Sequence, residues 1–140
     1  LRRMSYLVDT NVFSETLKPR PDAEVVEWLA ENESELFIST LTIAEIRRDI
    51  ERLPQGKRRD QLQQWLTSLN STMDGSILSF NRAAAHSRGQ MQGQLDLKGI
   101  RISPSDGILA PTAIRHGLTV VTRNERDFKD APVRMLNPFR

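Results

Sequence analysis

The stretch Tyr6-Leu7-Val8-Asp9-Thr10-Asn11-Val12-Phe13 decides the fold class of this chain, because a carboxylate directly follows a short apolar run. A buried strand that ends in an acid and passes into a helix is typical of open α/β sheets, where ligands bind at the carboxyl ends of the strands. A second acid, Glu45, interrupts the apolar-rich run 37–46, and a third, Asp106, precedes the apolar stretch 108–110. If the three acids converge, they form an oxygen-rich cage suited to a hard divalent cation.

Short apolar runs alternate with longer amphipathic stretches along the chain, which predicts a parallel sheet covered by helices. The expected strands are residues 6–8, 36–39, 77–80, 118–122 and 133–136. The expected helices are residues 11–17, 23–30, 40–53, 56–69, 82–95 and 105–116. The predicted fold class is therefore α/β, with a central parallel sheet of about five strands.

Length and composition indicate one ordinary globular domain, with hydrophobic residues at 38% and charged residues at 27% of 140 positions. The net charge is only +2, so nucleic acid binding is permitted but not implied. Cysteine is absent, which excludes disulfides and thiolate metal sites and suits a cytoplasmic protein. The apolar run before Asp9 is too short for a signal peptide or a membrane span. Met4 is the expected start, with residues 1–3 as an N-terminal extension.

Each acid also has a purely structural interpretation. Asp9 and Asp106 could cap the helices that follow them, and Glu45 could pair with Arg48, a contact worth about 0.2–0.5 kcal/mol. The three together are harder to explain in this way, because clustered carboxylates raise each other's pKa and a bound cation removes that cost. Mg²⁺ or Mn²⁺ is the expected ion, because the candidate ligands are oxygens and both histidines fall in helical stretches, at His86 and His116.

Four ordered motifs resemble those of the PIN-domain ribonucleases, and among these the VapC and FitB toxins of bacterial toxin–antitoxin pairs. They are Leu7-Val8-Asp9-Thr10-Asn11-Val12-Phe13-Ser14-Glu15, Thr42-Ile43-Ala44-Glu45-Ile46-Arg47-Arg48, Ser105-Asp106-Gly107-Ile108-Leu109-Ala110-Pro111-Thr112-Ala113 with His116-Gly117-Leu118, and Val121-Thr122-Arg123-Asn124-Glu125-Arg126-Asp127-Phe128. The ending Leu136-Asn137-Pro138-Phe139 is also similar to the usual close of the family. The resemblance therefore runs from about Met4 to Phe139.

The resemblance implies a single three-layer α/β/α PIN domain over residues 4–139, acting as a Mg²⁺- or Mn²⁺-dependent endoribonuclease and as the toxin of a VapBC-type pair. It implies Asp9 and Asp106 as direct metal ligands, with Glu45 completing the cage or orienting the attacking water. The implied partners are the RNA substrate, a small VapB-type antitoxin whose C-terminal segment occupies the active site, and a second copy of the chain in a homodimer. A membrane partner is not expected.

Two departures from the family pattern concern the site. The family usually carries a small helix-forming residue where Pro111 stands, and a proline inside a helix costs about 3 kcal/mol unless the helix bends. The helix of Asp106 is therefore expected to be kinked or to begin only near Pro111. Some relatives carry an acid where Asn124 stands, whereas the nearest acid here is Asp127, so either residue is a candidate for the fourth ligand. The residues expected to support the site by hydrogen bonding are Asn11 and Thr122.

Five basic residues around a predicted turn are candidates for RNA binding, with a solvated helix face as the alternative: Arg47, Arg48, Lys57, Arg58 and Arg59. Two other functions remain open. A phosphatase with Asp9 as a covalent nucleophile would share the acid at the strand end, but such enzymes carry a second Asp where Asn11 stands. A non-catalytic PIN module that binds RNA or a protein partner would be expected to have lost acids that this chain retains.

Overall fold

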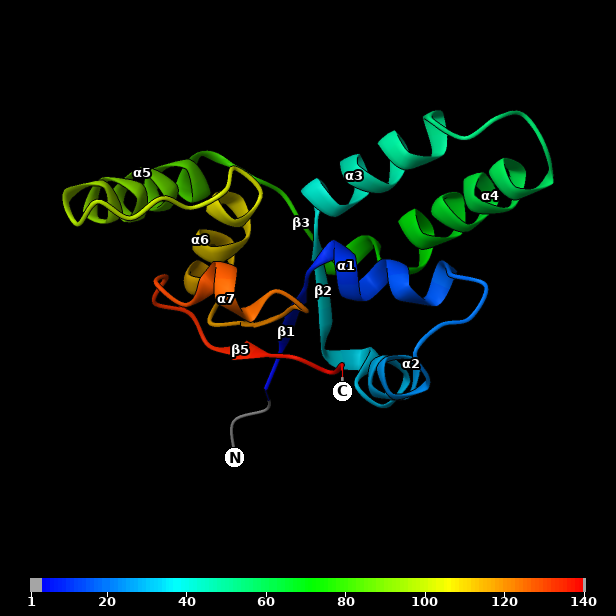
Figure 1. Ribbon diagram of the computed structural model, residues 1–140, viewed down its shortest axis with the longest axis horizontal. Coiled ribbons are helices and arrows are strands. Elements are labelled where there is room, and N and C mark those ends of the chain that lie inside the picture. The colour runs from blue at the N-terminus through cyan, green and yellow to red at the C-terminus, as the bar shows by residue number, and fades with distance from the viewer. Residues whose placement is uncertain (1–3, 140) are drawn as a thin grey trace.

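A computed structural model describes residues 4–139 as a parallel sheet covered by helices on both faces (Figure 1). The five strands run in the order β3-β2-β1-β4-β5, and every neighbouring pair is parallel. Their bounds are β1 Tyr6–Val8, β2 Leu36–Ser39, β3 Ile77–Leu78, β4 Thr119–Val121 and β5 Met135–Leu136. The predicted α/β class with about five parallel strands is confirmed. The predicted extension, residues 1–3, lies outside the described residues.

Seven α-helices connect the strands of the described chain, with three short 3-10 helices among them. The α-helices are α1 Thr10–Phe13, α2 Ala23–Glu31, α3 Thr40–Glu51, α4 Lys57–Thr72, α5 Arg82–Leu97, α6 Asp106–His116 and α7 Glu125–Phe128. The 3-10 helices are η1 Ser14–Leu17, η2 Glu33–Glu35 and η3 Asp74–Ser76. The single helix predicted over residues 11–17 is wrong in this respect, because the chain tightens into η1 after Phe13.

Local capping sets where several helices begin. The side chain of Ser39 accepts a hydrogen bond from the backbone N–H of Leu41 at the start of α3. Asn81 caps α5 in the same way, with Oδ1 3.0 Å from the backbone nitrogen of Ala84. This cap explains why β3 ends at Leu78 and does not extend to residue 80 as predicted: the chain already turns into α5 there.

The two faces of the sheet carry separate apolar cores, and β1 contributes to both. Successive side chains of a strand point to opposite faces, so Val8 packs with Ile38 and Ile50 on one side. Leu7 packs with Leu109 and other residues of α6 on the opposite side. Because β1 is the central strand and is covered on both faces, the residue that follows it, Asp9, lies in the middle of the carboxyl edge.

Helix α6 begins at Asp106 and continues through Pro111 to His116, so the expectation that it begins only near Pro111 is wrong. Ser103 makes this possible, because its side chain and its carbonyl accept hydrogen bonds from the backbone N–H groups of Asp106 and Gly107, at 3.2 and 2.8 Å. Pro111 itself is buried, and it cannot donate to the carbonyl of Gly107 as another residue would.

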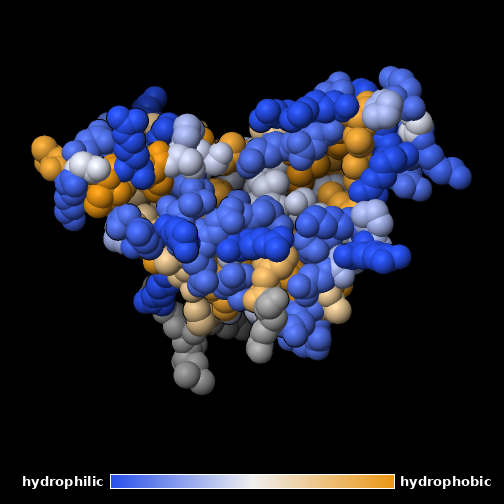
Figure 2. Space-filling view, in the orientation of Figure 1, coloured by the Kyte–Doolittle hydropathy of each residue, from blue (hydrophilic) through white to orange (hydrophobic). Residues whose placement is uncertain are grey.

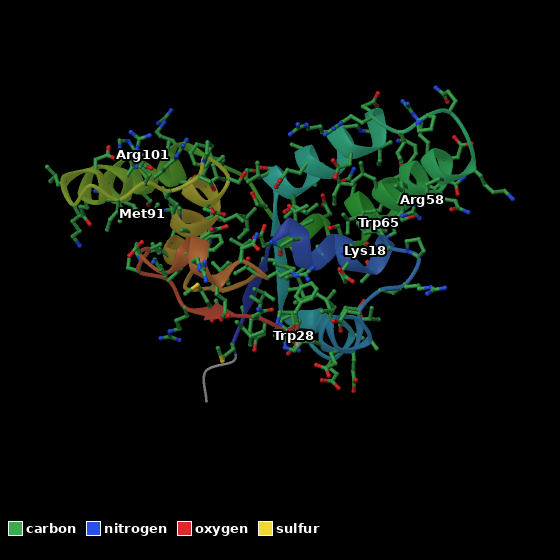
Figure 3. All side chains as sticks on the ribbon, viewed as in Figure 1. Lys18, Trp28, Arg58, Trp65, Met91 and Arg101 are labelled. Atoms are coloured by element: carbon green, nitrogen blue, oxygen red, sulfur yellow. The ribbon has the colours of Figure 1, made fainter. Side chains whose placement is uncertain are left out.

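The two tryptophans pack within the fold, each against another aromatic ring. Trp28 meets the ring of Tyr6 edge-on at 4.9 Å, and Trp65 lies 5.7 Å from the ring of Phe13. Figure 3 labels both, on α2 and α4. Across residues 4–139, every helix lacks either the length or the apolar character that crossing a bilayer requires.

Candidate active site

A cleft of about 360 Å³ lies at the carboxyl edge of the sheet, between two arms of the molecule. Helices α3 and α4 form one arm and α5 and α6 form the other (Figure 1). Figure 2 shows the surface hollowed between these arms, with mainly hydrophilic residues around the hollow. The lining residues are acids, amides and hydroxyls: Asp9, Thr10, Asn11, Ser14, Glu45, Ser103, Ser105, Asp106, Asn124 and Asp127.

Asp9 occupies the base of this cleft and is 9% exposed. Burial raises its pKa from the usual 3.8 to about 6; the hydrogen bond from Thr122 opposes this rise, and the negative charge of Asp106 adds to it. The backbone carbonyl of Asp9 accepts from the N–H groups of Val12 and Phe13, but its side chain makes no capping hydrogen bond. The carboxylate therefore points into the cleft, and the capping interpretation is not what the structure shows.

A buried hydrogen-bond network orients Asp9. The hydroxyl of Thr122, which is fully buried, donates to Oδ2 at 2.9 Å, and the amide of Asn11 donates to the same oxygen at 3.3 Å. The Thr122 hydroxyl also accepts from the backbone N–H of Asn124 at 3.0 Å. Asn11 in turn accepts from the N–H of Arg123. Thr122 and Asn11 thus lie where supporting residues are expected, with their polar groups directed at the acid.

Glu45 reaches the cleft from the second turn of α3. The hydroxyl of Thr10 donates to its Oε1 at 2.8 Å and lies 3.0 Å from the hydroxyl of Thr42. Within residues 4–139, Glu45 forms no ion pair with Arg48, so that alternative is not what the structure shows. Thr10, the residue next to Asp9, thus holds one carboxylate oxygen of Glu45 and fixes the position of Glu45 relative to Asp9.

Asp106 is 8% exposed at the first position of α6. Burial raises its pKa, the hydrogen bond to Ser103 opposes the rise, and the negative charges of Asp127 and Glu45 add to it. The N-cap position of α6 belongs to Ser105, and among the described residues no backbone N–H of α6 donates to the Asp106 carboxylate. Capping is therefore not what the structure shows for Asp106.

Both candidates for the fourth position line the cleft. Asn124 precedes α7, and Asp127 lies within that helix, close enough to Asp106 for its charge to raise the pKa of that acid. Asp127 lies inside α7, whose N-cap position belongs to Asn124. Both side chains lie at the cleft, and a ligand role for either residue stays a prediction.

Comparison with known proteins identifies the family. A family model for the PIN domain matches residues 6–133. The chain belongs to the PIN domain family. It is 37% identical to Toxin FitB of Neisseria gonorrhoeae over 95% of the chain and 97% of that protein, and 35% identical to VapC ribonuclease Y4jK of Sinorhizobium fredii over 95% and 96%. A FitAB complex bound to a DNA fragment superposes with a TM-score of 0.90 at 34% identity, covering 96% of both chains.

The donor set of this PIN domain fits a hard cation. Every lining side chain with a donor atom offers oxygen or amide groups, and neither His86 nor His116 lines the cleft. Mg²⁺ and Mn²⁺ favour such ligands. In the part of the chain that the structure describes, no group of three or more acids or histidines lies close enough together to hold a metal ion. Separate hydrogen bonds hold two of the acids, from Thr122 to Asp9 and from Thr10 to Glu45.

The basic residues proposed for RNA binding are partly engaged elsewhere. Arg47 donates to Gln63 at 2.6 Å, Arg59 lies 3.1 Å from Glu51, and Arg58, labelled in Figure 3, donates to the carbonyl of Leu17. These contacts join α3 to α4 and α4 to η1. Arg48 and Lys57 are exposed, and a role of all five in binding RNA stays a prediction.

Thr10, Ser14, Ser103 and Ser105 also line the cleft and were not predicted. The available signal was the hydroxyl residue directly beside an acid, as in Asp9-Thr10 and Ser105-Asp106. For Ser103, two residues further away, only the folded loop shows that it holds the start of α6.

Proposed function

We propose that this PIN domain is a Mg²⁺- or Mn²⁺-dependent endoribonuclease and the toxin of a VapBC-type toxin–antitoxin pair in the cytoplasm. The observation that carries the proposal is that two buried acids without capping roles, Asp9 and Asp106, open into one cleft with Glu45 and Asp127. The similarity to proteins named VapC ribonuclease and Toxin FitB supports the activity and the role. The FitAB complex supports an antitoxin partner, and we propose a homodimer as well.

Asp9 and Asp106 would hold the cation, because burial, with a smaller effect of neighbouring acids, raises the pKa of both carboxyl groups, and a bound cation would favour their charged forms. When bound, the ion supplies positive charge for the scissile phosphate and makes water a better nucleophile. Thr122 keeps Oδ2 of Asp9 directed at the site.

Glu45 would orient the attacking water. The Thr10 hydroxyl engages Oε1 and leaves Oε2 to accept a hydrogen bond from that water. The water oxygen would form a bond to phosphorus while the bond from phosphorus to the leaving ribose oxygen breaks. The proton released by the water would pass to solvent, and the leaving oxygen would take up a proton from solvent. Asp127 or Asn124 would complete the oxygen shell from the α7 side.

The test is incubation of the purified protein with end-labelled RNA in Mg²⁺, beside a chromogenic phosphate monoester, with Asp106→Asn as the inactive control. We expect RNA to be cut internally and the monoester to remain intact. Hydrolysis of the monoester alone would identify a phosphatase. RNA binding without cleavage, equal in both proteins, would identify a non-catalytic PIN module.

A further inference from the structure

Three of the described arginines have half-buried side chains: Arg47, Arg59 and Arg88. Arg47 donates to Gln63, and Arg59 pairs with Glu51. Arg88 differs, because within residues 4–139 it makes no hydrogen bond or ion pair. Polar groups that lose water on folding usually gain a partner. The donors of Arg88 are therefore available to a ligand.

Arg88 lies against the first turn of α6, the turn that carries Asp106. It belongs to α5, and a methyl group added to Gly107 would come within 3.2 Å of its Nε and 3.5 Å of its Nη2. Because glycine has no such group, the guanidinium can lie directly on the first turn of α6. Asp106, one residue earlier, lines the cleft. Arg88 thus contacts α6 one residue after Asp106, which lines a cleft whose lining, among residues 4–139, contains no cationic side chain.

Two other arginines make contacts within the fold. The guanidinium carbon of Arg123 lies 4.6 Å from the ring centroid of Phe139, and Arg58 donates to the carbonyl of Leu17. In Figure 3, Arg58 lies on the α3–α4 arm, away from the α5–α6 arm that carries Arg88. On the α5–α6 arm, which carries Asp106, Arg88 is the half-buried arginine without a hydrogen bond or ion pair among the described residues.

We propose that Arg88 binds a phosphate adjacent to the scissile phosphate of the RNA strand and so positions that strand from the α5 side of the cleft. The inference rests on the proposed function. Each RNA phosphate carries a negative charge, and the acids that hold a cation at the scissile position repel the neighbouring phosphates. A guanidinium offers two parallel N–H groups that match phosphate geometry. Arg88 is a substrate-binding residue and takes no part in bond breaking.

A structural role for Arg88 makes different predictions. Pro111 has no N–H to donate to the carbonyl of Gly107, and the guanidinium of a nearby arginine could donate to that carbonyl instead. The structure records no hydrogen bond between Arg88 and Gly107 among the described contacts. A packing residue would change thermal stability when replaced, whereas a phosphate-binding residue changes RNA affinity and its dependence on salt.

The experiment measures binding of a fluorescein-labelled single-stranded oligoribonucleotide over a range of salt concentrations, with Mg²⁺ and in an Asp9→Asn background that prevents cleavage. We expect Arg88→Ala to weaken binding about tenfold and to lower the slope of log affinity against log salt by about 0.7, the loss of one single-strand contact. Arg88→Lys should retain the slope, because it retains the charge. Arg88→Gln removes the charge at similar length and serves if Arg88→Ala fails to fold.

Arg115→Ala is the matched control, since Arg115 is exposed in the last turn of α6, the helix that Arg88 contacts at its first turn, and its loss changes the net charge equally. The inference is overturned if the uncharged Arg88 variants bind RNA with the affinity and slope of Arg115→Ala. Wild-type protein is assayed for RNA cleavage in parallel. Cleavage by wild type together with unaltered binding by Arg88→Gln refutes this inference alone, whereas absence of binding and cleavage in wild type refutes the proposed function with it.

Discussion

The hydroxyl of Thr122 donates a 2.9 Å hydrogen bond to Oδ2 of Asp9, across 113 positions of sequence. Both residues directly follow neighbouring strands, β4 and β1, so the parallel pairing of these strands brings them together. The bond opposes the effect of burial on Asp9 and therefore favours the ionised carboxylate. Thr122 contributes to the site through Asp9 and is a positioning residue.

Thr122→Val should impair cleavage at limiting Mg²⁺ by about tenfold, the equivalent of one hydrogen bond to a charged group. Without the hydroxyl, the pKa of Asp9 rises above about 6, so less of the acid is ionised at neutral pH. Carboxyl-carbon NMR titration of metal-free protein should show this rise directly. Thr112→Val is the control, because Thr112 is equally buried but donates to the carbonyl of Ile108 in α6. Equal effects of the two substitutions would contradict the assignment.

Asp9→Asn should stabilise the metal-free protein at neutral pH. The folded-state pKa of about 6 lies above the usual 3.8, so the folded protein binds this proton more tightly than the unfolded chain does. The protonated carboxyl group of Asp9 therefore contributes to the stability of the folded protein below about pH 4, and this contribution is lost as the pH rises through about 6. The free energy of unfolding lost at pH 7 is on the order of 2–3 kcal/mol.

Thermal unfolding in chelator at pH 4 and pH 7.5 tests this expectation. Asp9→Asn should exceed wild type in stability at the higher pH and lose that advantage at the lower pH. Asp130→Asn, an exposed acid outside the cleft, should follow wild type at both. A marked loss of stability in Asp9→Asn at pH 7.5 would instead support a capping role.

Asp127→Ala should reduce cleavage at low Mg²⁺ and be partly rescued when the metal concentration is raised, because it removes a charge near Asp106. Asn124→Asp should retain activity and bind the metal more tightly, since an amide oxygen brings no charge. Metal titrations of both variants measure this, with Asp130→Ala as the control on the same segment. If Asp127→Ala matches wild type across the whole titration, Asp127 is not part of the site.

Expression in a bacterial host without an antitoxin should arrest growth, whereas Asp9→Asn should not. The comparison requires matched protein levels, measured by immunoblot. Arg115→Ala, which changes a surface charge away from the cleft, should remain toxic. Equal growth of cells with wild type and with Asp9→Asn would count against a toxin role.

The sequence predicts the strands well because each buried strand is a short apolar run that ends at a polar residue. Asp9, Glu45 and Asp106 are recognisable for the same reason, as acids at the borders of apolar segments. Side-chain partners are less predictable, because they depend on loops. Ser103 adjusts the chain so that α6 can begin at Asp106, well before Pro111, and no periodicity reports that.

Arg88 illustrates the same limit. Its half-buried position depends on the packing of α5 against Gly107, and the sequence shows only an arginine in an amphipathic helix. The basic cluster after Arg47 is conspicuous in sequence, yet much of it joins α3 to α4.

The central claim is that the acids of this cleft cut RNA with the help of a divalent cation. The most direct test measures cleavage of end-labelled RNA, first in the presence of a chelator and then after metal is added. Purified wild type should lose cleavage in excess chelator and regain it on addition of Mg²⁺ or Mn²⁺, and Asp106→Asn should remain inactive under all conditions. Full activity of wild type in excess chelator, or cleavage by Asp106→Asn at the wild-type rate, would contradict the account.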